Sequence, residues 1–167
     1  MKVFVALFGI IGAVALCGSL GRQAQGAPDD RAQIAALYTT FVKALNKKDI
    51  NGVMSVYIHD KSLFAFDVSP PREYVGWDAY REDYKAFFDA VKGPLSEHVS
   101  ELQINVSGDS AFTHGVARIR STLKQGGALD VALRFTDVLR KMNGKWLIVH
   151  EHLSVPVDLA TGKAVMH

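Results

Sequence analysis

Four polar residues in the second half of the chain, Arg118, Asp137, His150 and His152, are the candidates for chemistry. An aspartate beside an imidazole orients the ring and stabilises its charged form, so Asp137 with either histidine would make an acid–base pair. Arg118 would hold the carboxylate of a ligand. These residue types therefore predict proton transfer or the recognition of a small polar group.

A metal site is the competing interpretation of the two histidines. Two imidazoles two residues apart lie on one face of a strand, but a third ligand would have to come from His114 or Asp137. No ligand spacing of a known metal site is complete. We therefore predict no metal and no cofactor, and consider a structural hydrogen bond the simpler role for the histidines.

Turn signals predict how these residues meet. Asn143-Gly144 is a strong two-residue hairpin signal, which places Met142 opposite Lys145. Counting back from this turn pairs Leu139 with Ile148, Asp137 with His150, and Phe135 with His152. A turn at Gly126-Gly127 then places Arg118 opposite Phe135 and diagonal to Asp137. Because Val131, Leu133, Phe135 and Leu139 share this face, the count predicts a polar patch on an apolar inner surface.

One apolar stripe disagrees with that count. Carried through the turn at Gly108-Asp109, the register puts Leu102, Ile104 and Val106 on the outer face. Either the stripe is a dimer surface, or a β-bulge changes which face it occupies. The sequence leaves both open.

Helices are expected before these strands. Apolar residues at three- and four-residue steps predict a helix that begins at Asp29-Asp30 and ends at Asn46, and a short second helix capped by Asp49. A short strand over 62–68 ends at Pro70-Pro71. A third helix over about 77–91 carries the aromatic stripe Trp77, Tyr80, Tyr84, Phe87 and Phe88, most of it core.

A meander of strands completes the domain. Period-two alternation begins near His98, and strands are expected over 112–124, 129–142 and 145–157. Three helices followed by a long antiparallel meander indicate an α+β fold.

The N-terminal residues read as an export signal. Lys2 is followed by the uncharged stretch Val3–Leu16, and a small-x-small site lies at Ala24-Gln25-Gly26. We expect cleavage near Gly26, residues 27–167 as one domain, and a secreted or periplasmic location. An uncleaved anchor, or lipid attachment at Cys17, is the alternative.

Charge and composition exclude several classes of function. The chain has 167 residues, with 19 Lys+Arg against 17 Asp+Glu. The predicted signal contains Lys2, Arg22 and the single cysteine, Cys17, so the remainder would be charge-balanced and thiol-free. We therefore expect no nucleic-acid binding, no disulfides and, after signal removal, no membrane segment.

Two stretches resemble a known superfamily. FVKALNKKDINGVMSVY (Phe41–Tyr57) is similar to the opening of nuclear transport factor 2-like domains. RFTDVLRKMNGKWLIVHEHLS (Arg134–Ser154) resembles the SnoaL-like branch and the association domain of calcium/calmodulin-dependent kinase II. The resemblance implies a cone-shaped curved sheet on three helices, an apolar pocket and a homodimer formed through the outer face of the sheet. It leaves function open, because the fold serves isomerases, cyclases, dehydratases and binding proteins.

The catalytic pattern of ketosteroid isomerase, to which the first helix is similar, is not matched. A gapless reading puts Phe41 at the position of its tyrosine donor and Ala65 at that of its catalytic aspartate. The second acid falls near Thr136 or Asp137, and Asp67 is a candidate base only if the strand is shifted. Phenylalanine has no proton to donate, so that mechanism is not supported.

Three functions remain open at this stage. The first is an exported domain that binds a small, mostly apolar and possibly carboxylate-bearing molecule. The second is an acid–base enzyme that uses Asp137 with His150 or His152, and the third is a dimeric interaction domain without ligand chemistry. The expected ligand-binding residues are Arg118, Trp77, Tyr80, Tyr84, Phe41 and Phe135.

Overall fold

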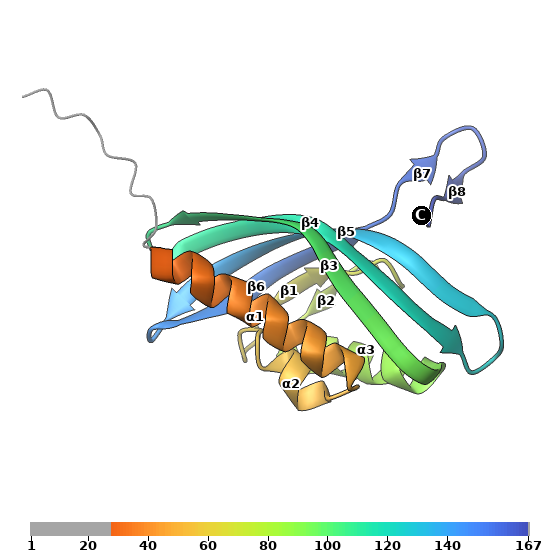
Figure 1. Ribbon diagram of the computed structural model, residues 1–167, viewed down its shortest axis with the longest axis horizontal. Coiled ribbons are helices and arrows are strands. Elements are labelled where there is room, and N and C mark those ends of the chain that lie inside the picture. The colour runs from red at the N-terminus through yellow and green to blue at the C-terminus, as the bar shows by residue number, and fades with distance from the viewer. Residues whose placement is uncertain (1–27, 167) are drawn as a thin grey trace, which may run out of the picture.

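The computed structural model describes residues 28–166 and has the predicted α+β architecture (Figure 1). The predicted signal sequence, its cleavage site and Cys17 lie outside the described residues. Among residues 28–166, no helix combines the length and the apolar character needed to cross a membrane.

Three helices form as their sequence patterns predict. Helix α1 (Pro28–Asn46) buries Ile34, Leu37 and Leu45. Helix α2 (Ile50–Met54) begins at Asp49, whose carboxylate accepts hydrogen bonds from the main-chain N–H groups of Asn51 and Gly52, each at 3.1 Å. Helix α3 (Trp77–Ala90) buries Tyr80 and Tyr84. Capping and an apolar stripe therefore explain these elements.

Six strands form one mixed sheet. The strands are β1 (Phe64–Phe66), β2 (Tyr74–Val75), β3 (Val91–Ser107), β4 (Ser110–Leu123), β5 (Ala128–Met142) and β6 (Lys145–Ser154). Their order is β2-β1-β6-β5-β4-β3, and only β1 and β6 run parallel. Strand β3 starts directly after α3, so Gly93-Pro94 lies inside the strand, at a register irregularity between Lys92 and Ser96, rather than between two elements.

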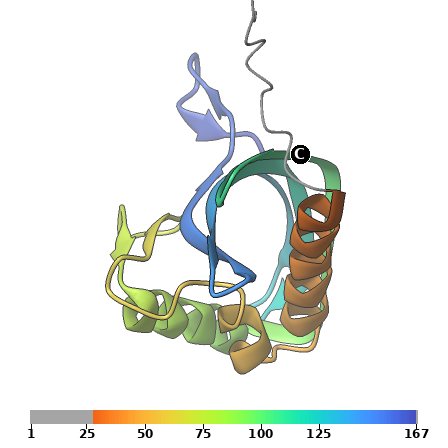
Figure 2. The same ribbon diagram turned by 90° about the vertical axis from the view of Figure 1, so that its left-hand side faces the viewer.

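The sheet curls strongly and the helices cover its concave side. Figure 2 shows the curled strands with α1 alongside them and α2 and α3 across one end. A separate hairpin of β7 (Val157–Asp158) and β8 (Lys163–Ala164), which the sequence analysis did not predict, projects beyond the sheet (Figure 1).

The last long hairpin contains the decisive departure from the predicted register. Met142 faces Lys145 and Leu139 faces Ile148, as predicted, but Val138 then faces His150. Val149 is therefore an extra residue, a β-bulge that exchanges the two faces of β6 beyond it. Asp137 faces Glu151, not His150, and the predicted pairing of Phe135 with His152 is also wrong.

The registers of the β4–β5 and β3–β4 pairs also bear on the predicted arrangements. The turn after β4 is wider than two residues, so Arg118 faces Ala132 rather than Phe135. The Gly108-Asp109 turn pairs Ser107 with Ser110, so Ile104 lies opposite Thr113 and Val106 opposite the buried Ala111, as counted from that turn. The shifted register between β4 and β5 puts Ala111 and Thr113 on the inner face, so the stripe of Leu102, Ile104 and Val106 packs on the core. The wider turn after β4, rather than a β-bulge or an outer dimer surface, therefore accounts for this stripe.

Candidate functional site

A cavity of about 450 Å³ lies between the helices and the concave face of the sheet. We call it the central cavity. Its walls are mainly apolar and come from α1, α3 and strands β3 to β6. The residues that line it include Tyr38, Phe41, Tyr84, Glu97, Ala117, Phe135, Asp137 and Glu151.

Asp137 is the polar group on the β5 wall of the cavity. Its side chain is 1% exposed, and the Tyr38 hydroxyl donates a hydrogen bond to its Oδ2. Because that phenol proton is used, Tyr38 accepts from the hydroxyl of Thr113. The Oδ1 atom of Asp137 has no hydrogen-bond partner within the described residues.

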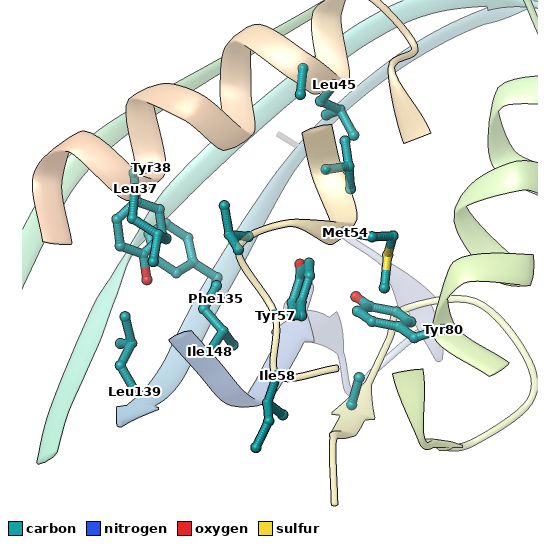
Figure 3. Close-up of a cluster of buried hydrophobic side chains, with 14 of the residues drawn as sticks. Leu37, Tyr38, Leu45, Met54, Tyr57, Ile58, Tyr80, Phe135, Leu139 and Ile148 are labelled. Carbon is teal, nitrogen blue, oxygen red and sulfur yellow. The ribbon is translucent and has the colours of Figure 1, made fainter. Parts of the chain in front are cut away.

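Glu151 lies opposite Asp137 in a cluster of tyrosines. Tyr80 and Tyr57 both donate to its Oε2, the latter over 3.0 Å, and Tyr84 in turn donates to Tyr57 over 2.9 Å. Figure 3 shows the Tyr57 and Tyr80 rings side by side and Tyr38 against Phe135. The bulge at Val149 brings Glu151 to this position by turning it inward.

Glu97 is the third buried carboxyl. Its backbone is fixed by Asn46 of α1, which accepts from the Glu97 N–H over 2.6 Å and donates to its carbonyl over 3.3 Å. Its Oε2 has no hydrogen-bond partner among residues 28–166. The side chain lines the same cavity as Asp137 and Glu151.

Burial changes the protonation of these acids. Removal from water disfavours the charged form and raises the pKa of Asp137 to about 7, against the lowering effect of the Tyr38 hydrogen bond. Burial, with the nearby charge of Asp137, raises the pKa of Glu97 to about 8. The same two causes raise the pKa of Glu151 well above its ordinary value. Asp137, Glu97 and Glu151 therefore hold protons at a higher pH than exposed carboxyls do.

The predicted polar patch does not exist as one cluster. His150 and His152 lie on the face of β6 opposite to Glu151, where Phe64 and Phe66 contact the rings. The Nδ1 atom of His150 is 2.9 Å from the carbonyl oxygen of Phe64, a structural role. Among the predicted catalytic residues, only Asp137 lines the cavity.

Arg118 also lies away from the cavity. Its neighbours Ala117 and Ile119 line the cavity wall, so Arg118 points to the convex face. There it makes a two-point ion pair with Asp130, at 2.8 and 2.9 Å, which lowers the pKa of Asp130 to about 2. The predicted role of Arg118 as a carboxylate anchor inside the pocket is therefore wrong.

The predicted ligand-binding aromatics divide into two groups. Phe41, Tyr84 and Phe135 line the central cavity. Tyr80 is fully buried behind it against Glu151. Trp77 stacks on His59, with ring centroids 3.9 Å apart, outside the cavity.

Sequence reasoning missed three site residues. Tyr38 lies three residues before Phe41, so the sequence pattern marks it only as part of the apolar face of the first helix. In the structure its hydroxyl contacts Asp137. Glu97 and Glu151 belong to none of the sequence motifs described above. The available signal for Glu151 was an acidic residue between two histidines in a strand that otherwise carries mainly apolar residues, where a buried charge is costly.

No metal centre is built from these acids. Among residues 28–166, no three His, Cys, Asp or Glu side chains are grouped so that they could hold a metal ion. The three buried carboxyls contact tyrosines or apolar walls instead.

Comparison with known proteins agrees with the fold. Residues 34–158 match the SnoaL-like domain family. An NTF2-like protein of unknown function from Pseudomonas putida is 26% identical, with a TM-score of 0.74 over 83% of this chain and 94% of that one. A ketosteroid isomerase-like protein from Erwinia carotovora is also 26% identical, with a TM-score of 0.65 over 76% and 96% of the two chains.

A third structure bears on the resemblance to kinase association domains. A calcium/calmodulin-dependent protein kinase II association domain-like structure from Xanthomonas campestris is 26% identical, with a TM-score of 0.62 over 72% of this chain and 84% of that one. A search of curated proteins found no match. With the family match covering most of its length, the chain belongs to the SnoaL-like domain family and has its NTF2-like fold.

Proposed function

We propose that the domain binds a small, mostly apolar molecule in the central cavity. The observation that carries the proposal is a cavity of about 450 Å³ with apolar walls and an unpartnered carboxyl oxygen on Asp137. Sites for small molecules are usually of roughly 300–1,000 Å³, apolar, and equipped with a few polar groups that fix orientation. A free carboxylic acid is a poor candidate ligand, because the wall supplies acids and Arg118 lies outside.

Binding is tested with 2-naphthol, an uncharged fluorescent probe of suitable size. We expect saturable binding to the wild-type protein. Ala117 lines the cavity, so Ala117→Phe fills it and should weaken binding by about tenfold or more. Val116 directly precedes Ala117 and faces the other side of the sheet. Val116→Phe is therefore the matched control and should bind 2-naphthol as the wild-type protein does.

Two results would contradict this proposal. One is the absence of binding by a wild-type protein that native mass spectrometry also shows to carry no co-purified molecule. The other is equal binding by the Ala117→Phe and wild-type proteins, with circular dichroism showing both folded, because the probe would then bind elsewhere.

Acid–base catalysis in the same cavity is the second candidate function. The observation in its favour is a cavity carboxyl, Asp137, whose pKa of about 7 suits proton exchange near neutral pH. The predicted partners His150 and His152 face away, so Asp137 would act with Tyr38 beside it. NMR detection of α-proton exchange in 2-tetralone should give a rate with an inflection near this pKa, lost in Asp137→Asn. Equal rates with and without protein would exclude this reaction.

A further inference from the structure

The central cavity has an unusual balance of charged residues. Five of its wall residues are acids, namely Asp67, Asp83, Glu97, Asp137 and Glu151. None of the described residues that line it is Lys, Arg or His. A binding site with several acids and no internal counter-charge is complementary to a cation.

Most of these acids already have hydrogen-bond partners from the protein. Asp67 accepts from the backbone N–H and hydroxyl of Ser69, each at 3.0 Å, and Asp83 accepts from the Tyr74 hydroxyl. Glu151 accepts from two tyrosines. The buried oxygens that have no hydrogen-bond partner within residues 28–166 are Asp137 Oδ1 and Glu97 Oε2, both on side chains more than nine-tenths buried.

The surroundings of Asp137 offer it no positive charge. Tyr38 of α1 and Thr113 of β4 contact it, Glu151 faces it from β6, and Glu97 of β3 acts on it through space. The two phenols of its neighbourhood, Tyr38 and Tyr57, stay protonated because burial raises their pKa. Every titratable group near Asp137 is therefore neutral or an acid.

We propose that the natural ligand is a monocation, an apolar amine whose ammonium group is bound by Asp137 and Glu97. The proposal rests on the ligand-binding function proposed above and names its substrate class. An ammonium group donates up to three hydrogen bonds and carries a positive charge, so it would satisfy both free oxygens and balance the charge that forms when Asp137 loses its proton.

Aromatic walls favour the same class of ligand. The rings of Phe41, Tyr84 and Phe135 line the cavity, and aromatic faces attract cations. A neutral alcohol would donate a hydrogen bond to one oxygen but would not balance the charge of a carboxylate. The apolar body of the amine would lie against Val99, Ala117 and Ile119.

Amine binding should be coupled to proton release. Below its pKa of about 7, Asp137 is mainly protonated in the empty cavity. An ammonium ligand binds the carboxylate form, so the acid gives its proton to solvent and one ion pair forms inside. The affinity for an amine therefore rises with pH up to this pKa, whereas the affinity for an alcohol of the same shape has no such dependence.

The test uses three probes of one shape: 2-naphthylmethylamine, 2-naphthylmethanol and 2-naphthoate. Isothermal titration calorimetry at about pH 6, in buffers of different ionisation enthalpy, counts the protons released. We expect the amine to bind about tenfold more tightly than the alcohol at neutral pH, and the anion to bind most weakly. We also expect proton release with the amine alone.

Two variants locate the effect. Asp137→Asn keeps the shape but not the charge of the side chain, so it should reduce the ratio of amine affinity to alcohol affinity by about tenfold. Asp130→Asn removes an acid paired with Arg118 on the other face and should alter neither.

The outcomes separate the two proposals. Alcohol binding that equals or exceeds amine binding, or amine binding without proton release, would overturn the cationic ligand and leave the binding function standing. Failure of all three probes, together with 2-naphthol, would overturn the binding function itself.

Discussion

Burial of Asp137 and Glu97 makes the stability of the protein depend on pH. In the folded state the pKa of Asp137 is about 7 and that of Glu97 about 8, both above the ordinary values of 3.8 and 4.5. Between these limits the folded protein holds more protons than the unfolded chain. The free energy of unfolding therefore falls as pH rises through this window.

This sign leads to a measurable prediction for Asp137. Thermal unfolding followed by circular dichroism should give a Tm at least about 4 °C lower at pH 8 than at pH 5. Asp137→Asn cannot ionise and should flatten part of that slope. In Asp130→Asn the slope should be unchanged, because the pKa of Asp130 is about 2 and lies outside the window. Equal slopes for wild-type protein and Asp137→Asn would contradict the assignment.

Gly115 of strand β4 lies close to both neighbouring strands, β3 and β5. A Cβ placed on Gly115 would lie 2.8 Å from the Phe135 ring of β5 and 2.9 Å from the Ser100 carbonyl oxygen of β3. The Ser100 oxygen is a backbone atom of the sheet, so this contact cannot be relieved by turning a side chain. Glycine is therefore required for these three strands to approach one another.

Gly115→Ala should consequently destabilise the sheet. We expect a loss of about 1–3 kcal/mol in the free energy of unfolding, as for other overpacked cores, measured by urea denaturation. Val116→Ala, one residue away on the opposite face, is the control and should cost less. A Gly115→Ala protein as stable as wild type would show that the strands separate easily at this point.

The elements also show what a sequence can and cannot specify. The Asn143-Gly144 turn and the helix patterns were sufficient for the α+β fold and for the pairs nearest the turn. Leu147, Ile148 and Val149 are all apolar, so alternation gives no phase there and the bulge leaves no turn signal. Asp137 lies on the inner face, as predicted. Because the bulge could not be seen in the sequence, His150 and His152 were expected on that face too, whereas the structure puts Glu151 there.

The convex face of the sheet carries a small apolar patch. Phe112 is 50% exposed and Val138, opposite it on β5, is 37% exposed, next to His150. The family resemblance implies a homodimer through this face of the sheet, and these residues would be its centre. The dimer remains a prediction.

Substitution at the centre of that face tests it. If the dimer forms there, Phe112→Asp places a charge in an apolar interface and should give a monomer by light scattering coupled to size-exclusion chromatography. Leu159→Asp is a control on the β7–β8 hairpin, at a side chain that is 95% exposed, and should leave the mass unchanged. A wild-type protein that is already monomeric at high concentration would exclude the dimer.

The C-terminal segment after β8 returns to strand β5 and reaches the wall of the central cavity. Beyond the projecting β7–β8 hairpin the chain turns back, the carbonyl oxygen of Met166 accepts from the N–H of Ala132 over 2.8 Å, and Met166 lines the central cavity. A purification tag fused after this segment would start at the cavity wall and could compete with a probe. A tag placed before Pro28 would leave from the outer end of α1 (Figure 1), so the position of the tag decides whether a binding assay samples the empty site.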